Sequence, residues 1–349
     1  MLRCSFYSYK GGSGRSTTAW NTIQRLVTIM EPTTEAPFVI VDTDTESAGA
    51  TFLYDAKDEF FKNAVKASVQ KRMLEKDDTK YRKADADVKA AFFETMWPVG
   101  KKFGLPDEKN AAVLLIGANL DKNKETTVID RDGPQMANFT NNITKACKAC
   151  GAKALFFDTP SGTQYLARKS IQDSRIIVCC MRPTSQFRTG TRDQLIDFVM
   201  EDHKAEIDKV YILTPTAICT DDGQKFGGQS YPEQAQREIE SEFSGKTIKI
   251  DNVFKDDHEI IRSTVSNYVL LDMLKPTPNE YKVYGIGEVP EDNERVFGIP
   301  EVRRFKWFEQ CLGCLSENEL TSNGRMAINR YNYLANTIYN QYKEKFCDE

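Results

Sequence analysis

The chain has 349 residues, of which 40% are hydrophobic and 28% charged, as in an ordinary globular protein with a substantial core. Its formal net charge of −4 excludes a general attraction to nucleic acid, so any such contact needs a local basic patch. Only two histidines are present, which argues against a histidine-rich metal centre and against a Ser-His-Asp hydrolase.

Short apolar runs alternate with helical patterns along the chain. The expected strands are residues 2–9, 38–41, 113–116, 154–157, 175–181 and 210–213, and the expected helices are 16–30, 135–150, 186–201 and 317–345. This alternation predicts an α/β fold with a doubly wound, mostly parallel central sheet and helices on both faces. We expect one domain over residues 1–349, with a helical insertion at 55–104 and an extended insertion at 276–312.

The chain shows no sign of membrane insertion or export. It contains no run of about 18 apolar residues, and its first residues lack the pattern of a secretory signal. We therefore expect a cytoplasmic protein, whose nine cysteines are free thiols in a reducing compartment.

A glycine-rich turn joins the first expected strand to the first expected helix. It comprises Lys10, Gly11, Gly12, Ser13, Gly14, Arg15, Ser16 and Thr17. Glycines allow backbone N–H groups to approach phosphate closely, and the helix N-terminus behind them favours an anion. The general pattern G-x-x-x-x-G-K-[ST] is broken twice, because Tyr9 replaces its first glycine and Arg15 its lysine. The alternative is an ordinary Gly-Ser turn beside basic residues.

Carboxylates follow two of the expected buried strands. Asp42 and Asp44 follow the strand at 38–41, and Asp158 follows the strand at 154–157. Ligands of open α/β sheets bind at such carboxyl ends. One carboxylate there can hold Mg²⁺ and another can orient an attacking water. The alternative for each is a solvated strand end.

The turn from Lys10 to Thr17 resembles the deviant Walker A loop of the ParA/MinD ATPase superfamily, K-G-G-x-G-K-[ST]-T, in the branch that ends in arginine. The resemblance implies a P-loop NTPase that binds ATP and Mg²⁺ through this loop. It also implies that Lys10 reaches across a dimer interface to the partner's nucleotide, and that Arg15 replaces the usual lysine.

The two strand ends resemble further motifs of the same superfamily, D-x-D and D-T-P-x-[GS]. The resemblance implies that Asp44 serves hydrolysis and that Asp42, Asp158 and Ser16 lie on the metal side. It further implies that Gly162 offers an N–H to the γ-phosphate.

The implied activity is slow ATP hydrolysis that resets an ATP-dependent homodimer, whose output is to position or segregate a cargo such as DNA or a protein complex. An activating partner protein is expected, and non-specific DNA is a further candidate partner. The basic and aromatic run 303–307 could contact nucleic acid, but we favour a solvated helical face beside a core Trp there. No membrane anchor is expected, because residues 346–349 are not a basic amphipathic tail. One alternative is a metal or iron–sulfur carrier of the same fold. Another is a regulatory subunit of a larger conflict or secretion system, which binds its partner through residues 55–104.

Two C-x-x-C pairs bear on the carrier alternative, Cys147 with Cys150 and Cys311 with Cys314. Tetrahedral zinc needs four ligands, which two such pairs would supply. Relatives hold a metal or cluster between subunits through a late C-x-x-C, which implies such a role for Cys311 and Cys314. We favour packing as small hydrophobes, above all for Cys147 and Cys150 at helical spacing, and expect less than one metal ion per chain.

Overall fold

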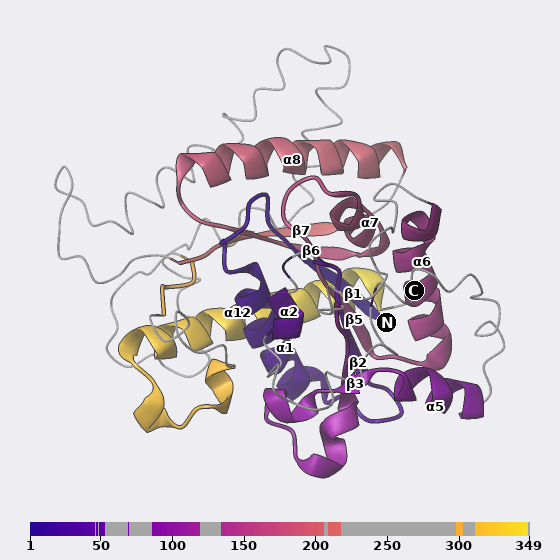
Figure 1. Cartoon of the computed structure of the whole chain (residues 1–349). Coiled ribbons are helices and arrows are strands. Elements are labelled where there is room, and N and C mark those ends of the chain that lie inside the picture. Colours follow the sequence, from indigo (N-terminus) through magenta and orange to yellow (C-terminus); the bar gives the residue numbers. More distant parts are fainter. Residues whose placement is uncertain are drawn as a thin grey trace.

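A seven-stranded sheet runs through the centre of the computed structural model, which describes residues 1–45, 47, 49–52, 69, 86–118, 134–205, 209–217, 298–302 and 311–347 (Figure 1). The strands are β1 Leu2–Tyr7, β2 Phe38–Asp42, β3 Trp97–Pro98, β4 Val113–Ile116, β5 Ala154–Asp158, β6 Ile176–Met181 and β7 Val210–Pro215. Their order is β3-β4-β2-β5-β1-β6-β7. All neighbours pair in parallel except β3 and β4.

Helices cover both faces of this sheet (Figure 1). One face carries α1 Arg15–Met30 and α12 Ser322–Phe346, and the other carries α5 Ala86–Glu94, α6 Pro134–Cys150, α7 Tyr165–Asp173 and α8 Ser185–Lys204. The short helix α2 spans Gly49–Phe52, and the 3₁₀ turns among the described residues span Gly100–Phe103, Asp107–Ala112, Leu312–Cys314 and Glu317–Glu319. The predicted doubly wound fold is confirmed.

The strands are apolar on both sides because both sides are covered. Cys4 and Phe6 of β1 belong to the core beneath α1 and α12, whereas Tyr7 packs edge-on against Phe198 of α8, with 5.3 Å between ring centroids. Strands buried on both faces read as continuous hydrophobic runs, which is why their positions could be predicted from the sequence.

The structure departs from the expected elements in a few places. Helix α7 and strand β3 were not predicted, and β3 lies inside the expected helical insertion at 55–104. Pro98 can occupy β3 because this strand is at the sheet edge, where the missing N–H leaves no ladder bond unmade. Helix α12 begins at Ser322 rather than 317, because the Thr321 side chain caps it by accepting a hydrogen bond from the Gly324 N–H.

Several predictions concern residues that the structure does not describe. Most of the insertion at 55–104 and of the extended insertion at 276–312 lies outside the described residues, as does the basic and aromatic run 303–307. Among the described helices, none combines the length and the apolar character needed to cross a bilayer.

A buried ion pair ties the end of α8 to the start of β7. The Lys209 ammonium has no exposed surface and donates to Asp202 Oδ1 at 2.7 Å and to the Ile171 carbonyl at 3.0 Å. The Tyr211 hydroxyl donates to the other Asp202 oxygen. Every polar atom of this pair is thus satisfied inside the protein, as a buried charge requires.

We predict that Lys209→Ala lowers the free energy of unfolding by about 3 kcal/mol, because it leaves the Asp202 carboxylate buried without its partner. Thermal or urea unfolding measures this. Lys101→Ala is the matched control, because its ion pair with Asp107 is largely exposed and contributes at most about 1 kcal/mol. Equal losses in the two variants would contradict the prediction.

Candidate phosphate and metal site

The turn between β1 and α1 curves around a pocket of about 250 Å³. Gly12 and Gly14 have φ angles of 78° and 77°, which favour glycine, and Gly14 is the N-cap of α1. Gly14 has no side chain to cap the helix, and the first N–H groups of a helix have no partner within it. The turn therefore presents backbone donors and a helix N-terminus to one pocket, as phosphate binding requires.

Loops from three neighbouring strands meet at this pocket. It is lined by Ser8, Gly11, Gly12, Ser13, Gly14, Arg15, Ser16 and Thr17 of the turn, by Asp44, Ser47 and Gly49 after β2, and by Ser161 after β5. The Gly162 N–H donates to the Ser8 carbonyl at 3.0 Å, and the Thr216 hydroxyl donates to the Ser13 carbonyl. The loops after β5 and β7 thereby hold the turn in place.

Arg15 bridges the two carboxylates that the sequence assigned to different strand ends. Its Nε donates to Asp158 Oδ1 at 2.6 Å, and its Nη2 donates to Asp44 Oδ2 at 2.9 Å. All three side chains are less than 10% exposed. Burial by itself would lower the pKa of the Arg15 guanidinium, but the charges of Asp158 and Asp44 outweigh it and raise that pKa, so Arg15 stays charged.

Asp42 lies behind the pocket and does not line it. Its Oδ2 accepts hydrogen bonds from the Thr51 N–H at 2.7 Å and the Thr51 hydroxyl at 2.6 Å, and its Oδ1 accepts from the Asp44 N–H at 3.1 Å. Burial and the charge of Asp158 raise the pKa of Asp42 to about 8, although the Thr51 hydrogen bonds lower it. In this structure, Asp42 therefore positions Asp44 and the α2 segment.

A small polar space next to Arg15 fits a cation. Asp158 Oδ2 is buried and has no hydrogen-bond partner among the described residues. A Cβ added at Gly49 would lie 3.5 Å from this oxygen and would collide with Ser16 Oγ. Ser16 Oγ and Asp158 Oδ2 thus flank one space that Gly49 keeps open, and hard oxygen donors of this kind suit Mg²⁺.

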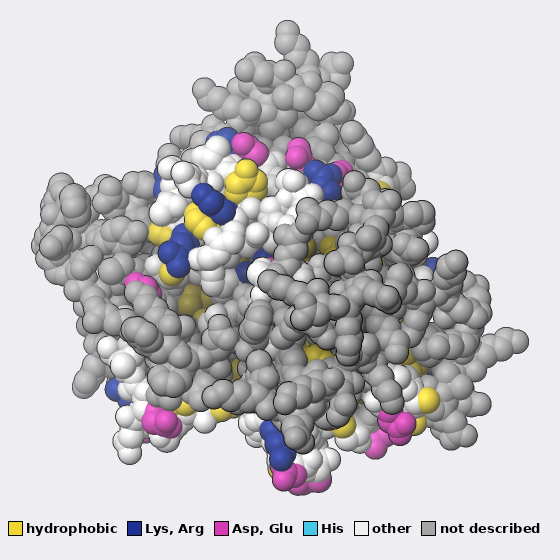
Figure 2. Space-filling model, viewed as in Figure 1, with side chains coloured by type: hydrophobic (Ala, Val, Ile, Leu, Met, Phe, Trp, Pro, Cys, Tyr) yellow, Lys and Arg dark blue, Asp and Glu magenta, His cyan; other side chains and the backbone are white. Residues whose placement is uncertain are grey.

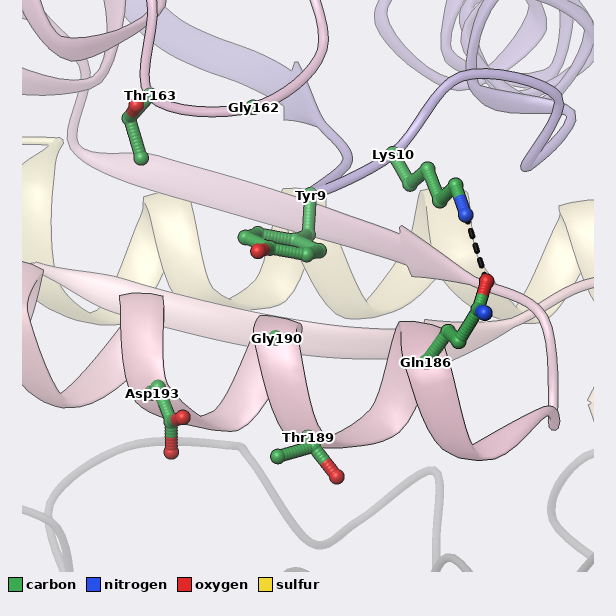
Figure 3. A pocket seen from close by; sticks show the side chains of 8 residues that line it. All are labelled: Tyr9, Lys10, Gly162, Thr163, Gln186, Thr189, Gly190 and Asp193. Carbon is green, nitrogen blue, oxygen red and sulfur yellow. Dashed lines mark hydrogen bonds between the residues drawn. The ribbon is translucent and has the colours of Figure 1, made fainter.

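Lys10 extends away from its own phosphate pocket. Its ammonium donates to Gln186 Oε1 in the first turn of α8 at 2.6 Å, and it lines a second, surface cavity of about 640 Å³ (Figure 3). The ring of Tyr9 lies over Gly190 of α8, where a Cβ would collide with it. Tyr9, which replaces the expected glycine, therefore anchors the turn to α8.

The structure brings most predicted residues together. The turn residues 11–17, Asp44 and Asp158 meet at one site, whereas Asp42 lies behind it and Lys10 points out of it. Thr51, Gly49 and Gln186 also contribute to this site but were not predicted from the sequence. Of these, Gly49 could have been found from the sequence. It lies five residues after Asp44, and a glycine near a strand-end carboxylate can mark a place where the backbone comes close to other groups.

The two C-x-x-C pairs lie on opposite faces of the sheet. Cys147 and Cys150 belong to the core under α6, and Cys311 to the core under α1 and α12. Since the sheet separates them, the pairs cannot supply four ligands to one metal ion within a chain. Among the described residues, no group of three or more His, Cys, Asp or Glu is arranged to hold a metal ion.

The sheet order, the glycine turn and the strand-end carboxylates define an α/β fold of the P-loop NTPase type. Neither a protein-family model nor a curated protein sequence matches the chain.

Solved structures similar to this chain include cobyrinic acid a,c-diamide synthase from Mycobacterium smegmatis, which is 13% identical with a TM-score of 0.49 over 98% of this chain and 96% of that one. MinD from Pyrococcus horikoshii is 15% identical with a TM-score of 0.45 over 97% and 98%, respectively. McdA from Cyanothece is 12% identical with a TM-score of 0.45 over 78% and 93%. All three similarities have identities of 12–15% and TM-scores below 0.5, and they concern the fold alone.

We predict that Arg15→Ala loses most ATP binding and also lowers the stability of the nucleotide-free protein by about 3 kcal/mol, because two buried carboxylates lose their cation. Arg15→Lys should retain binding, since it keeps a cation at that point. Isothermal titration and thermal unfolding measure the two effects. Arg168→Ala serves as control, because its half-exposed pair with Glu201 contributes at most about 1 kcal/mol. Unchanged ATP binding in Arg15→Ala would mean that the turn holds phosphate by its backbone and Lys10 alone.

Proposed function

We propose that this chain is a Mg²⁺-dependent ATPase of the ParA/MinD type, which acts as a dimeric switch to position or segregate a cargo. The observation that carries the proposal is the buried bridge from Arg15 to Asp44 and Asp158 at the floor of a glycine-lined pocket. The phosphate-loop cation and the strand-end carboxylates thus occupy one site, as phosphoryl transfer requires.

Binding of a triphosphate exchanges protein partners for ligand oxygens. The turn amides and the Arg15 guanidinium bind phosphate, so Arg15 gives up part of its contact with the two carboxylates. Ser16 Oγ and Asp158 Oδ2 are the atoms that would hold Mg²⁺, which when bound neutralises charge on phosphate oxygens. Once Arg15 leaves Asp44, the Asp44 carboxylate can accept a hydrogen bond from the attacking water and orient it.

The loop after β5 supplies the sensor of the γ-phosphate in this proposal. Gly162 N–H is bonded to the Ser8 carbonyl here, so the same donor must leave Ser8 to reach a phosphate oxygen. A γ-phosphate offers charged oxygens in exchange for a neutral carbonyl, which favours the move, because bonds to charged acceptors are stronger. ATP and ADP would therefore leave this loop in different positions.

The direction of Lys10 supports the dimer in this proposal. Its ammonium lies outside its own phosphate pocket and is held by one exposed hydrogen bond to Gln186. That bond is weak in water, so a phosphate on a facing copy can replace it.

An activating partner protein and a cargo of DNA or a protein complex belong to the same proposal. Around α8, the described surface carries acidic and basic side chains side by side (Figure 2).

We predict that Ser16→Ala and Asp158→Asn each weaken ATP binding in magnesium by about 1–3 kcal/mol, because each removes a group that holds a charged centre. Binding without magnesium should change less. Thr163→Ala is the control, because Thr163 lines the second cavity and not the phosphate pocket. Affinities in magnesium that equal the parent's for both variants would rule out this metal site.

We further predict that Lys10→Ala and Asp44→Ala fail in different ways. Lys10→Ala should bind ATP but show little ATP-dependent dimer and little turnover, because it cannot reach the facing nucleotide. Asp44→Ala should bind ATP, dimerise and stay closed, because the water is no longer oriented. Light scattering and phosphate release with Mg²⁺-ATP measure both.

Gln186→Ala is the matched control for Lys10→Ala, because it removes the partner of Lys10 in the monomer but keeps the ammonium. It should dimerise as the parent does. A parent that stays monomeric in Mg²⁺-ATP, or a Lys10→Ala variant that dimerises as well as Asp44→Ala, would contradict the dimeric switch.

A further inference from the structure

Cys311 and Cys314 are placed in one tight turn against the flank of α1. The turn is the 3₁₀ helix Leu312–Cys314 with Cys311 as its N-cap, and the Cys314 N–H donates to the Cys311 carbonyl at 3.0 Å. A turn closed in this way keeps the two Cα atoms within about 7 Å. That separation lies at or within the range that a disulfide bond spans.

The two thiols differ in exposure. An exposed thiol can act as the attacking nucleophile, and a buried neighbour can act as the resolving thiol. Cys311 is buried, and its Sγ lies 3.8 Å from the Trp20 carbonyl of α1. Cys314 is exposed, and its Sγ lies 3.7 Å from the Lys102 carbonyl. A reagent can therefore reach Cys314 directly, whereas Cys311 can be reached only through its neighbour.

A cation lies beside this turn. A Cβ added at Gly313 would collide with Nη2 of Arg25, so the Arg25 guanidinium rests on the backbone between the two cysteines. A hydrogen bond with the Cys311 thiol and, to a smaller extent, the charge of Arg25 lower the pKa of Cys314 to about 7, against its partial burial. The same hydrogen bond and burial raise the pKa of Cys311. This is the environment of a reactive cysteine.

The second C-x-x-C pair has the same spacing and the opposite surroundings. Cys147 and Cys150 are buried in the core under α6, at most 1% exposed. Burial raises the pKa of Cys150. Cys147 and Cys150 therefore serve as an internal control, because they share the C-x-x-C spacing but lack the exposure of Cys314.

We propose that Cys311 and Cys314 form a redox-active dithiol that exchanges with an accessible disulfide. The Cys314 thiolate attacks one sulfur of the incoming disulfide R–S–S–R, forms a mixed disulfide and expels one thiolate, which takes up a proton as RSH. Cys311 then loses its proton and attacks Cys314 Sγ, which expels the second RSH. The dithiol is oxidised to a disulfide, and the incoming disulfide is reduced to two thiols. The exchange chemistry at this pair does not require the proposed ATPase activity.

Oxidation at this turn would act on α1. The Leu312 N–H donates to Asn21 Oδ1 at 2.8 Å, and the residues beside the turn include Gln24 and Arg25 of the same helix. Helix α1 begins at the phosphate turn. Oxidation of the pair would therefore alter the contacts of the helix that carries the nucleotide site.

The test uses the reduced full-length protein, with oxidised glutathione in increasing ratio to reduced glutathione as the probe. Acid quenching, maleimide labelling and peptide mass mapping should find a Cys311–Cys314 disulfide in the parent and in Cys147→Ser. Cys311→Ser should stop at a glutathione adduct on Cys314, and Cys314→Ser should form neither product. The rate at which Cys314 is alkylated should rise with pH with a midpoint near 7.

Four results would overturn the proposal. One is a parent that never forms the Cys311–Cys314 disulfide. A second is a glutathione adduct that persists on the parent as it does on Cys311→Ser. A third is oxidation of Cys147 and Cys150 at the same ratio. The fourth is stoichiometric zinc in the purified protein that is lost in Cys311→Ser and blocks oxidation, which would make the pair metal ligands.

Discussion

The site depends on one buried guanidinium among three carboxylates. Asp42 and Asp158 pair across the adjacent strands β2 and β5, and Asp44 follows two residues later, so parallel pairing forces three acids to one end of the sheet. Asp42, whose pKa is raised to about 8, can carry a proton, but the buried Asp44 and Asp158 carboxylates would repel each other without a cation. Arg15 supplies that cation, and it is also the residue that binds phosphate in the proposed function. In the proposed function, ligand binding is therefore an exchange of partners at Arg15 rather than the filling of an empty pocket.

The phosphate turn is also bound to its surroundings from outside. Tyr9 lies against Gly190 of α8, and the loops after β5 and β7 donate to carbonyls of the turn. These contacts connect α8 and the loops after β5 and β7, which are far apart in sequence, to the same short turn. A change at Gly162 or at Lys10 on ligand binding would therefore be transmitted to α8 and to the surface cavity that both residues line.

The two cysteine pairs show that the C-x-x-C spacing by itself does not determine reactivity. Cys147 and Cys150 lie in a long helix under the sheet and are inaccessible, whereas Cys311 and Cys314 lie in a surface turn beside Arg25. The electrostatic and solvent environment, rather than the C-x-x-C pattern, determines which pair can react.

The sequence by itself determined the parallel strands, most helices, the glycine turn and the strand-end carboxylates, because buried parallel strands and phosphate turns have strong local patterns. It did not reveal the edge strand β3, the contact of Asp42 with Thr51, the space kept open by Gly49 or the outward direction of Lys10. Each of these depends on contacts between segments that are distant in sequence or on the local path of a loop. Such contacts have no local signature, so only the tertiary structure decided them.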